Sequence, residues 1–541
     1  MRRKRFGDDT TEAKIGRDVQ DIMRGRPVQK NTDPERDPGY EAFIPEESAP
    51  SGKKTKAEIM AKKKAEKKRR KEESRRAAPY VFISYAFVFI FISLIIYLVY
   101  FNIYRRDEVQ NSTYNRRQDT QARYVVRGSI LSADRDVLAQ TNVYDGNEVR
   151  EYPYGRAFAH VVGYASNGKS GIESIANYDL LASHYNVIDR VINEFSGAKS
   201  PGDSVVTTLS SGLQQTCYNV LGDYQGAIMV MDPQTGAVLA MVSKPDFDPN
   251  TIAEDWDSIV SGEGNSQLVN RATQGLYPPG STFKIVTALS YFQQFGTFEG
   301  FDFNCEGQLT VADHTVHCFN GIVHGQENFV QAFANSCNCA FSSVGLDLGA
   351  DRLRTTAETL LFGKKLPCAL NYNISRFTLK DEDGSAAMMQ TAFGQGNTVA
   401  TPYHMALITA AIANGGVVMQ PQFISKIESA DGRTVRENRS TEYRRIMTDS
   451  EAMVMRDLMK EVIASGTATE LSGLEYTVAG KTGSAEYYMA DGQIGTHSWF
   501  VGYSNVDDPD IVVVVLAENG GAGSQTAVPM AHQIFDAYYY G

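Results

Sequence analysis

Three short segments, far apart in the chain, contain residue types that together could activate a serine as a nucleophile. They are Ser281-Thr-Phe-Lys284, Ser336-Cys-Asn338 and Lys481-Thr-Gly483. A serine hydroxyl is a poor nucleophile unless a neighbouring group takes its proton, and no histidine is close to Ser281 in the sequence. The pattern therefore favours a site in which a lysine serves as the base for the serine.

Ser281 has the surroundings of a nucleophile, whereas the other serines with a lysine three residues later do not. Those serines lie in a basic tail or in polar, Gly-rich stretches: Ser51, Ser166 and Ser196. Ser281 follows Tyr277-Pro-Pro-Gly280 and opens an apolar run over residues 283–292, so a loop ends and a helix begins at this serine. One helical turn then places Lys284 beside Ser281.

Lys284 is the candidate general base. It must be uncharged in order to accept a proton, and this requires partial burial and a second cation nearby. Lys481 could supply that cation, and the Ser336 hydroxyl would bridge the two lysines as a proton relay. The three segments would then form a single catalytic unit.

The other residues of these segments would bind the substrate. Asn338 would offer its amide to the substrate backbone, and Thr482, Gly483 and Ser484 would bind its carboxylate end. The backbone N–H groups of Ser281 and Ser484 would form an oxyanion hole, an arrangement that is worth several kcal/mol in acyl transfer. Alone, Lys-Thr-Gly is typical of a surface turn and Ser-x-Asn of a helix cap, so the hypothesis depends on all three segments together.

The sequence after residue 203 predicts one mixed α/β domain. Strand patterns occur at both of its ends, over residues 226–243 as a hairpin and then over residues 476–479, 497–503 and 511–516. A mostly helical part from Ser281 to about Asn414 separates them, and residues 527–540 read as a closing helix. We expect both ends to share one five-stranded sheet, preceded by a small α/β region that ends near residue 203.

Charge divides the chain into two chemically different parts. Residues 1–78 hold 23 Lys and Arg against 15 Asp and Glu, a net charge of +8, which leaves −19 for the remainder because the whole chain carries −11. Between them, residues 81–101 contain no charged side chain and have the length of a transmembrane helix. Thirteen basic residues between Lys53 and Arg76 predict that the N-terminus lies in the cytoplasm.

Four of the six cysteines fall within residues 305–339, close to three histidines: His314, His317 and His324. A metal site is one interpretation, but Cys337 and Cys339 belong to the second segment and its flank, and the spacing matches no zinc template closely. A disulfide between Cys305 and Cys318 is favoured in an exported domain, with two free thiols as the alternative. The sequence leaves this choice open.

The three segments, in this order, resemble those of class B penicillin-binding proteins of Gram-positive type, which are peptidoglycan D,D-transpeptidases. Other stretches resemble the family's non-catalytic pedestal domain: Arg127-Gly-Ser-Ile130, Tyr152-Pro-Tyr-Gly155, His160-Val-Val-Gly-Tyr164 and Gly171-Ile-Glu173. Further stretches resemble landmarks of the transpeptidase domain: Met231-Asp-Pro233, Phe393-Gly-Gln-Gly396 and Ala411-Ile-Ala-Asn-Gly-Gly416. The resemblance covers almost everything after the apolar run.

The resemblance implies a chemistry and a fold. Ser281 would attack the D-Ala-D-Ala bond of a stem peptide and release D-Ala, and the acyl group would pass to an amine on a neighbouring stem. β-Lactams would trap the same serine. The implied fold is a five-stranded, mainly antiparallel sheet with helices on both faces and a helical subdomain. We expect no cofactor, no metal and no nucleic-acid partner.

The resemblance also implies a domain order. Residues 1–78 would be a basic, disordered cytoplasmic tail with a possible basic helix near residues 55–76, and residues 79–104 would span the lipid bilayer once. Residues 105–203 would form the pedestal, and residues 204–541 would form the transpeptidase domain outside the cell. Nothing before the transpeptidase domain resembles a glycosyltransferase, so a separate membrane glycosyltransferase is the expected partner.

Three alternative functions remain open at this point. A D,D-carboxypeptidase or a β-lactamase would pass the acyl group to water, although such single-domain hydrolases seldom carry a long tail and a pedestal. A β-lactam sensor would need a cytoplasmic effector domain or several membrane spans, and the tail offers neither. An inactive scaffold would not need all three complete segments.

Overall fold

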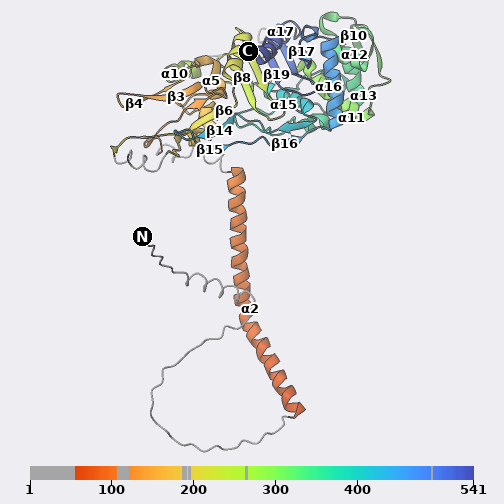
Figure 1. The fold of residues 1–541 in the computed structure, drawn as a ribbon. Coiled ribbons are helices and arrows are strands. Elements are labelled where there is room, and N and C mark those ends of the chain that lie inside the picture. The colour runs from red at the N-terminus through yellow and green to blue at the C-terminus, as the bar shows by residue number, and fades with distance from the viewer. Residues whose placement is uncertain (1–54, 106–120, 186–191, 193–195, 262–265, 489–491) are drawn as a thin grey trace, which may run out of the picture. The chain divides into compact units, whose positions relative to one another are not determined.

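The computed structural model describes residues 55–105, 121–185, 192, 196–261, 266–488 and 492–541 (Figure 1). The chain divides into two compact units, residues 1–97 and residues 98–541. The tail expected to be disordered lies, over residues 1–54, outside the described residues.

The described part of the first unit consists mainly of a long helix, α2 (Lys56–Tyr100). This helix continues past residue 97 into a π-helix at Phe101–Arg105. Its first half coincides with the basic helix that the sequence allows near residues 55–76. Within the described part of the chain, one helical segment, Ala78–Ile103, is long and apolar enough to cross a membrane, and its apolar side chains are exposed. A helix suits a lipid surface because it satisfies its own backbone hydrogen bonds.

A five-stranded sheet forms the centre of the second unit. Its strands lie in the order β17 (Val478–Tyr488), β18 (Ile494–Ser504), β19 (Val512–Ala517), β7 (Gly226–Met231) and β8 (Val238–Lys244). All four neighbouring pairs are antiparallel. The prediction that both ends of the domain share one sheet is confirmed, and β17 extends beyond the predicted strand to include Lys481, Gly483 and Ser484.

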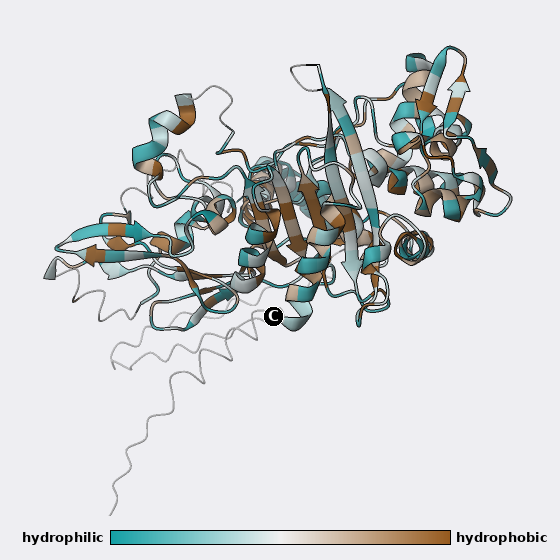
Figure 2. Ribbon diagram, turned by 90° about the horizontal axis from the view of Figure 1, so that it is seen from above, coloured by the Kyte–Doolittle hydropathy of each residue, from teal (hydrophilic) through white to brown (hydrophobic). Residues whose placement is uncertain are grey.

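The composition of the central strands explains why this sheet is covered on both faces. Every residue of β7 and of β19 is buried, and both strands are almost continuously apolar (Figure 2). A strand that exposed one face to water would instead alternate apolar and polar residues. On one side α9 (Ser211–Leu221) packs against β7, β8 and the closing helix α17 (Ala527–Tyr540), and on the other α15 (Pro402–Ala413) packs against β7, β18 and β19.

Helix α15 is buried along its whole length because it is apolar on every side. Its start is set by Thr401, whose hydroxyl accepts a hydrogen bond from the His404 N–H at 3.1 Å, and by Pro402 in the first turn. Helix α16 (Asp449–Ala464) contacts both α15 and β17. Helix α16 therefore packs against β17, the strand that carries Lys481.

The segment between Ser281 and Asn414 is mostly helical, as predicted. Its helices are α11 (Lys284–Phe295), α12 (Phe329–Ala334), α13 (Asn338–Thr359), α14 (Gly384–Ala392) and α15. The prediction missed two small antiparallel sheets, one of β9 (Asp302–Cys305) and β12 (Gly325–Asn328) and one of β10 (Gln308–Val311) and β11 (His314–His317). These strands are short and half exposed, so they carry little apolar periodicity.

The small region before residue 204 is built around a six-stranded sheet. Its order is β15 (Thr434–Glu437), β14 (Ile424–Glu428), β6 (Ser204–Thr207), β2 (Ile130–Leu131), β3 (Val137–Tyr144) and β4 (Asn147–Glu151). Strands β14 and β15 come from the second half of the chain. The sheet therefore crosses the expected boundary at residues 203 and 204 and ties the two regions together.

The remaining elements complete both regions. They are β1 (Val125–Val126), α5 (Ala159–Val162), α6 (Gly171–Ile175), α7 (Asn177–Leu181), β5 (Ser200–Pro201), α10 (Ile252–Ser261), β13 (Val417–Met419) and β16 (Glu442–Arg445). In α6, Glu173 is fully buried and accepts hydrogen bonds from Arg127 Nε at 2.6 Å and Arg150 Nε at 2.7 Å. Paired hydrogen bonds of this kind are what allow a carboxylate to be buried.

Candidate active site

Ser281 lies in a short 3₁₀ helix, η3 (Gly280–Phe283), that leads directly into α11. The preceding Gly280 has a φ of +52°, and a Cβ at this position would lie 2.9 Å from the Cβ of Ala485 on β17. Only glycine accepts both the left-handed conformation and the close approach. The loop thus places Ser281 close to β17, the strand that carries Lys481.

Lys284 lies one turn after Ser281, as the spacing predicts, and its Nζ is 3.1 Å from Ser281 Oγ. The amine is also within hydrogen-bond distance of the Ser336 carbonyl at 2.6 Å, Ser336 Oγ at 3.2 Å and Asn338 Oδ1 at 2.8 Å. Its side chain is fully buried, and Nζ lies 5.5 Å from the ring centre of Phe341 on α13. Four oxygens around one buried amine fix its position relative to the serine.

Ser336 lies in the tight connection between α12 and α13. Its φ of +58° is left-handed, a conformation that costs a residue with a Cβ about 1 kcal/mol or more. The next residue, Cys337, caps the start of α13, because its Sγ accepts a hydrogen bond from the Ala340 N–H at 3.4 Å. Asn338 is the first residue of that helix. The second segment is therefore held in a strained turn by the helices on both sides.

Lys481 reaches the same serine from the opposite side. Its Nζ donates to Ser336 Oγ at 2.9 Å and to the carbonyl of Thr482 at 3.1 Å, and its side chain is fully buried. The Ser336 hydroxyl thus lies between the amines of Lys284 and Lys481. This is the arrangement of Lys284, Ser336 and Lys481 that the sequence predicts for a proton relay.

Burial lowers the pKa of Lys284 to about 8. Burial, followed by the like charge of Lys284, lowers the pKa of Lys481 well below its ordinary value. Since both amines contact one hydroxyl, a charge on either disfavours a charge on the other. The sequence predicted that partial burial and the cation of Lys481 would together keep Lys284 uncharged. Burial is the largest cause of its lowered pKa, and the like-charge effect acts on the pKa of Lys481.

Gly483 allows β17 to run close to the serine loop. A Cβ on Gly483 would lie 3.1 Å from Thr282 Cγ2 and 3.2 Å from the Pro279 carbonyl oxygen. Next to it, Ser484 Oγ accepts a hydrogen bond from the Gly523 N–H at 3.1 Å, which orients the hydroxyl. Close packing against the serine loop and the hydrogen bond to Ser484 therefore both constrain this part of β17.

A cavity of about 1230 Å³ opens over this cluster. Five of the predicted residues line it: Ser281, Ser336, Asn338, Thr482 and Ser484. Lys284, Lys481 and Gly483 do not line the cavity. The two lysines instead contact the hydroxyls of residues that do line it. The predicted residues therefore converge on one site, with the two lysines buried beneath Ser281.

Several residues that line the same cavity were not predicted from the sequence. Thr467 Oγ1 lies 2.5 Å from Thr482 Oγ1, and Gln395, Tyr487 and Ser524 lie on the walls. Thr467 follows α16 with no motif to identify it. His497 is buried behind the wall and stacks on Tyr487 with ring centres 4.1 Å apart.

Comparisons with known proteins agree with this arrangement. Residues 226–536 match the penicillin binding protein transpeptidase domain, and residues 127–205 match the penicillin binding protein A dimerisation domain. The chain is 31% identical to the peptidoglycan D,D-transpeptidase PbpA of Mycolicibacterium smegmatis over 427 residues, which cover 73% of this chain and 84% of that protein.

Solved structures are similar over the same region. A D,D-transpeptidase domain of a peptidoglycan glycosyltransferase from Eggerthella lenta is 33% identical, with a TM-score of 0.69 over 77% of this chain and 98% of that one. The imipenem acyl-enzyme complex of penicillin-binding protein A from M. tuberculosis is 26% identical, with a TM-score of 0.69 over 78% and 99%.

Proposed function

The chain belongs to the penicillin-binding protein transpeptidase family, and from this premise we propose that Ser281 is the residue on which its acyl-enzyme forms. The protein is a class B peptidoglycan D,D-transpeptidase of cell-wall synthesis and a target of β-lactams. The observation that supports Ser281 is the contact of one buried amine, Lys284 Nζ, with Ser281 Oγ, Ser336 Oγ and Asn338 Oδ1 together.

In the first half-reaction, Ser281 Oγ attacks the carbonyl carbon of the D-Ala-D-Ala bond while its proton moves to the uncharged Lys284 Nζ, 3.1 Å away. The tetrahedral intermediate collapses when the C–N bond breaks. The leaving amine takes the proton from Lys284 through the Ser336 hydroxyl and departs as D-Ala. The product is an ester between the stem peptide and Ser281.

In the second half-reaction, an amine of a neighbouring stem peptide attacks the ester carbonyl. Its proton passes to Lys284 and then to Ser281 Oγ as the C–O bond breaks, so the serine is restored and an amide cross-link forms. Backbone N–H groups of Ser281 and Ser484 would stabilise the oxyanion in both steps. Asn338, Thr482, Gly483 and Ser484 would hold the donor peptide along β17.

Acyl transfer to an amine distinguishes this function from a hydrolase. The purified full-length protein would be given a stem peptide ending in D-Ala-D-Ala together with a labelled D-amino acid as acceptor. We expect the label to enter the peptide in step with the release of D-Ala, and Ser281→Ala to abolish both. Release of D-Ala with no incorporated label would instead identify a D,D-carboxypeptidase.

We further propose four parts for the chain: a cytoplasmic tail (1–78), a membrane span (79–104), a pedestal (105–203) and a transpeptidase domain (204–541). Two observations support this division. The two matched domains fall within the third and fourth parts to within a few residues, and the candidate span Ala78–Ile103 almost coincides with the second.

The orientation in the membrane follows from charge. Thirteen Lys and Arg residues between Lys53 and Arg76 precede the apolar segment, and such clusters stay on the cytoplasmic side. The catalytic region would then face the cell wall. Protease added to intact protoplasts should digest the region after Tyr104 and spare the tail, and digestion of the tail alone would contradict this orientation.

A membrane glycosyltransferase is the partner that we propose, because the chain carries the cross-linking site without a recognisable polymerase. Small residues on the apolar segment of α2, namely Ser84, Ala86 and Ser93, would permit a partner helix to approach closely. Replacing the span with an unrelated transmembrane helix should preserve penicillin acylation and reduce co-purification of the partner. Unchanged co-purification would make the helix an anchor only.

A further inference from the structure

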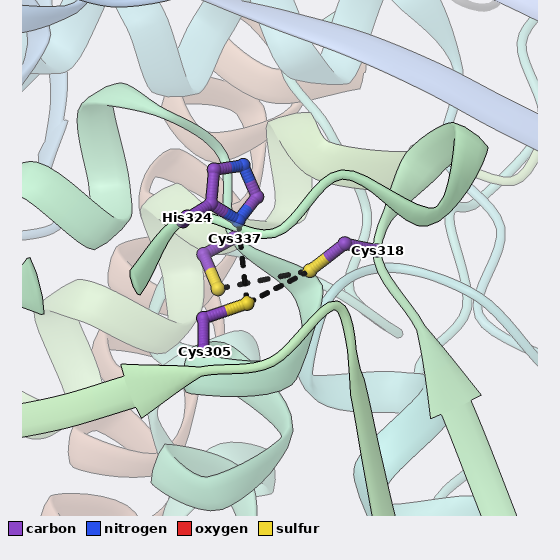
Figure 3. Close-up of side chains that lie close together, drawn as sticks. All are labelled: Cys305, Cys318, His324 and Cys337. Atoms are coloured by element: carbon purple, nitrogen blue, oxygen red, sulfur yellow. Dashed lines mark hydrogen bonds between the residues drawn. The ribbon is translucent and has the colours of Figure 1, made fainter. Parts of the chain in front are cut away.

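Four potential metal ligands converge beside the active site. The Sγ atoms of Cys305, Cys318 and Cys337 and a ring nitrogen of His324 all lie within 4.8 Å of one another. Figure 3 shows the three sulfurs and the imidazole pointing toward a common centre. The three cysteines are no more than 2% exposed, and His324 is half-buried. Such a group is unusual in a protein core unless it serves a purpose.

The ligands come from the ends of four different elements. Cys305 ends β9, Cys318 follows β11, His324 precedes β12 and Cys337 begins α13. These are the short strands that the sequence analysis missed, together with the helix that carries Asn338. Their ends turn toward one point (Figure 3).

The spacing of the ligand atoms is that of a tetrahedral zinc site. Zinc bonds sulfur at about 2.3 Å and nitrogen at about 2.0–2.1 Å, so the edges of the tetrahedron are about 3.8 Å between sulfurs and about 3.6 Å between sulfur and nitrogen. Here Cys318 Sγ lies 3.6 Å from Cys305 Sγ and 3.7 Å from Cys337 Sγ, and Cys305 Sγ lies 3.4 Å from His324 Nδ1. These three edges are close to the ideal values, and the other three are no longer than 4.8 Å.

Backbone groups around the cluster favour thiolates. The Gly307 N–H donates to Cys305 Sγ at 3.4 Å, and the Ala340 N–H donates to Cys337 Sγ at 3.4 Å. Hydrogen bonds of this kind orient metal ligands and stabilise their negative charge. Cys337 also lies at the N-terminus of α13, where the helix dipole stabilises a thiolate.

We propose that Cys305, Cys318, Cys337 and His324 bind one zinc ion that holds the Ser336-Cys337-Asn338 turn in its catalytic position. Three thiolates and one imidazole form a complete tetrahedral set, which is typical of a structural zinc site. On binding, the thiol protons pass to solvent and the ion takes their place. The proposal replaces both the expectation of no metal and the favoured Cys305 to Cys318 disulfide.

The disulfide does not explain the geometry. A disulfide joins two sulfurs at about 2.05 Å, whereas all six cysteines lie within the described residues as free thiols and three of them share one centre with an imidazole. A bond between Cys305 and Cys318 would leave Cys337 and His324 without their common partner. A zinc ion uses all four ligands.

The consequence for catalysis follows from the position of Cys337. It separates Ser336, whose hydroxyl contacts both lysines, from Asn338, whose amide contacts Lys284. A zinc ion would join Cys337 to the ends of β9, β11 and β12 and so hold the strained turn at Ser336 in place. Cys337 therefore acts as a positioning residue. This consequence rests on the proposed function, whereas metal binding by itself does not.

The test measures metal content first. Full-length protein, purified in detergent under thiol-reducing conditions and with zinc in the medium, should contain one zinc ion per chain by mass spectrometry of the metal. Replacement by Co²⁺ should give the thiolate charge-transfer band and the intense visible bands of a tetrahedral cobalt site. Neither measurement needs a variant. A metal-free protein that takes up no zinc, or a native Cys305 to Cys318 disulfide in peptide mapping, would overturn the proposal.

Variants then identify the ligands. Cys318→Ser should lower the zinc content to less than about a tenth of an ion per chain, since three ligands rarely hold a structural zinc ion. Cys339→Ala is a close control, because its sulfur lies 3.4 Å from Cys318 Sγ but outside the ligand set, and Cys368→Ala is a second control outside the cluster. Both should keep one zinc ion. Loss of zinc in Cys339→Ala together with retention in Cys337→Ser would contradict the ligand assignment.

Acylation is measured last, on the same wild-type protein before and after chelation. Removing the zinc should lower the rate constant for penicillin acylation about tenfold to 100-fold, the loss that a displacement of about 1 Å in a catalytic group can cause, and added zinc should restore it. Ser281→Ala should lose acylation while keeping its zinc, so failure of the proposed nucleophile and failure of the metal site give different results. An unchanged rate after complete zinc removal would overturn the positioning role.

Discussion

Replacing Ser281 with alanine should abolish covalent labelling by fluorescent penicillin, because the attacking oxygen is removed. The hydroxyl of Ser336 also contacts the buried amines of Lys284 and Lys481, but as a proton relay it should form no adduct. Mass mapping of the labelled wild-type protein should place the adduct on the peptide that contains Ser281. The loss should be complete rather than partial, since the label is a bond to that one atom.

Ser166→Ala is the matched control for this experiment. Ser166 also precedes a lysine by three residues, yet it lies in a turn of the pedestal where Lys169 has a left-handed φ of +65°. This variant should label as the wild-type protein does. Stoichiometric labelling of Ser281→Ala, or an adduct mapped to another peptide, would show that the nucleophile has been assigned wrongly.

The sequence predicted most of what surrounds Ser281, and the reasons are local. A loop with Pro and Gly followed by an apolar run determines both the 3₁₀ turn and α11, so the position of Lys284 relative to Ser281 follows from helix geometry alone. Apolar strands such as β7 and β19 are recognisable because they are buried on both faces. The closing helix α17 is recognisable by its length and composition.

Other features depend on contacts between distant parts of the chain. Strands β14 and β15 pair into the pedestal sheet more than 200 residues after β6, and nothing in residues 424–437 identifies that neighbour. The left-handed φ of Ser336 is a response to the two flanking helices. Thr467 joins the cavity wall only because β17 places Thr482 beside it.

The cysteine cluster shows the same limit. In the sequence, Cys305 and Cys318 are 13 residues apart and suggest a disulfide, and Cys337 is counted with the catalytic segment. Only the two missed β-sheets bring His324 and Cys337 to the same centre. Spacing along the chain could not reveal this set, because its ligands belong to four elements whose pairing is not local.

Lys284 should be indispensable for acylation. Lys284→Met removes the proton acceptor that lies 3.1 Å from Ser281 Oγ, and we expect the rate constant for penicillin acylation to fall by about 100-fold to 10,000-fold, the usual contribution of a general base. Lys284→Arg should fail to a similar extent because a guanidinium stays protonated at every usable pH. Stopped-flow or gel measurements of the acylation rate, with circular dichroism to check the fold, provide the test.

The pH dependence supplies the independent check on that role. Only uncharged Lys284 can accept the proton, and burial lowers its pKa to about 8, so acylation at limiting penicillin should rise with pH through about 8 and then level off. The opposite sign, a rate that falls as pH rises through this range, would mean that the charged amine is the active form. Lys284→Met should lose this dependence along with its rate, whereas a control at an exposed lysine, Lys364→Met, should keep both. Near-normal acylation by Lys284→Arg would contradict the general-base role, since the arginine would then be supporting catalysis by its charge alone.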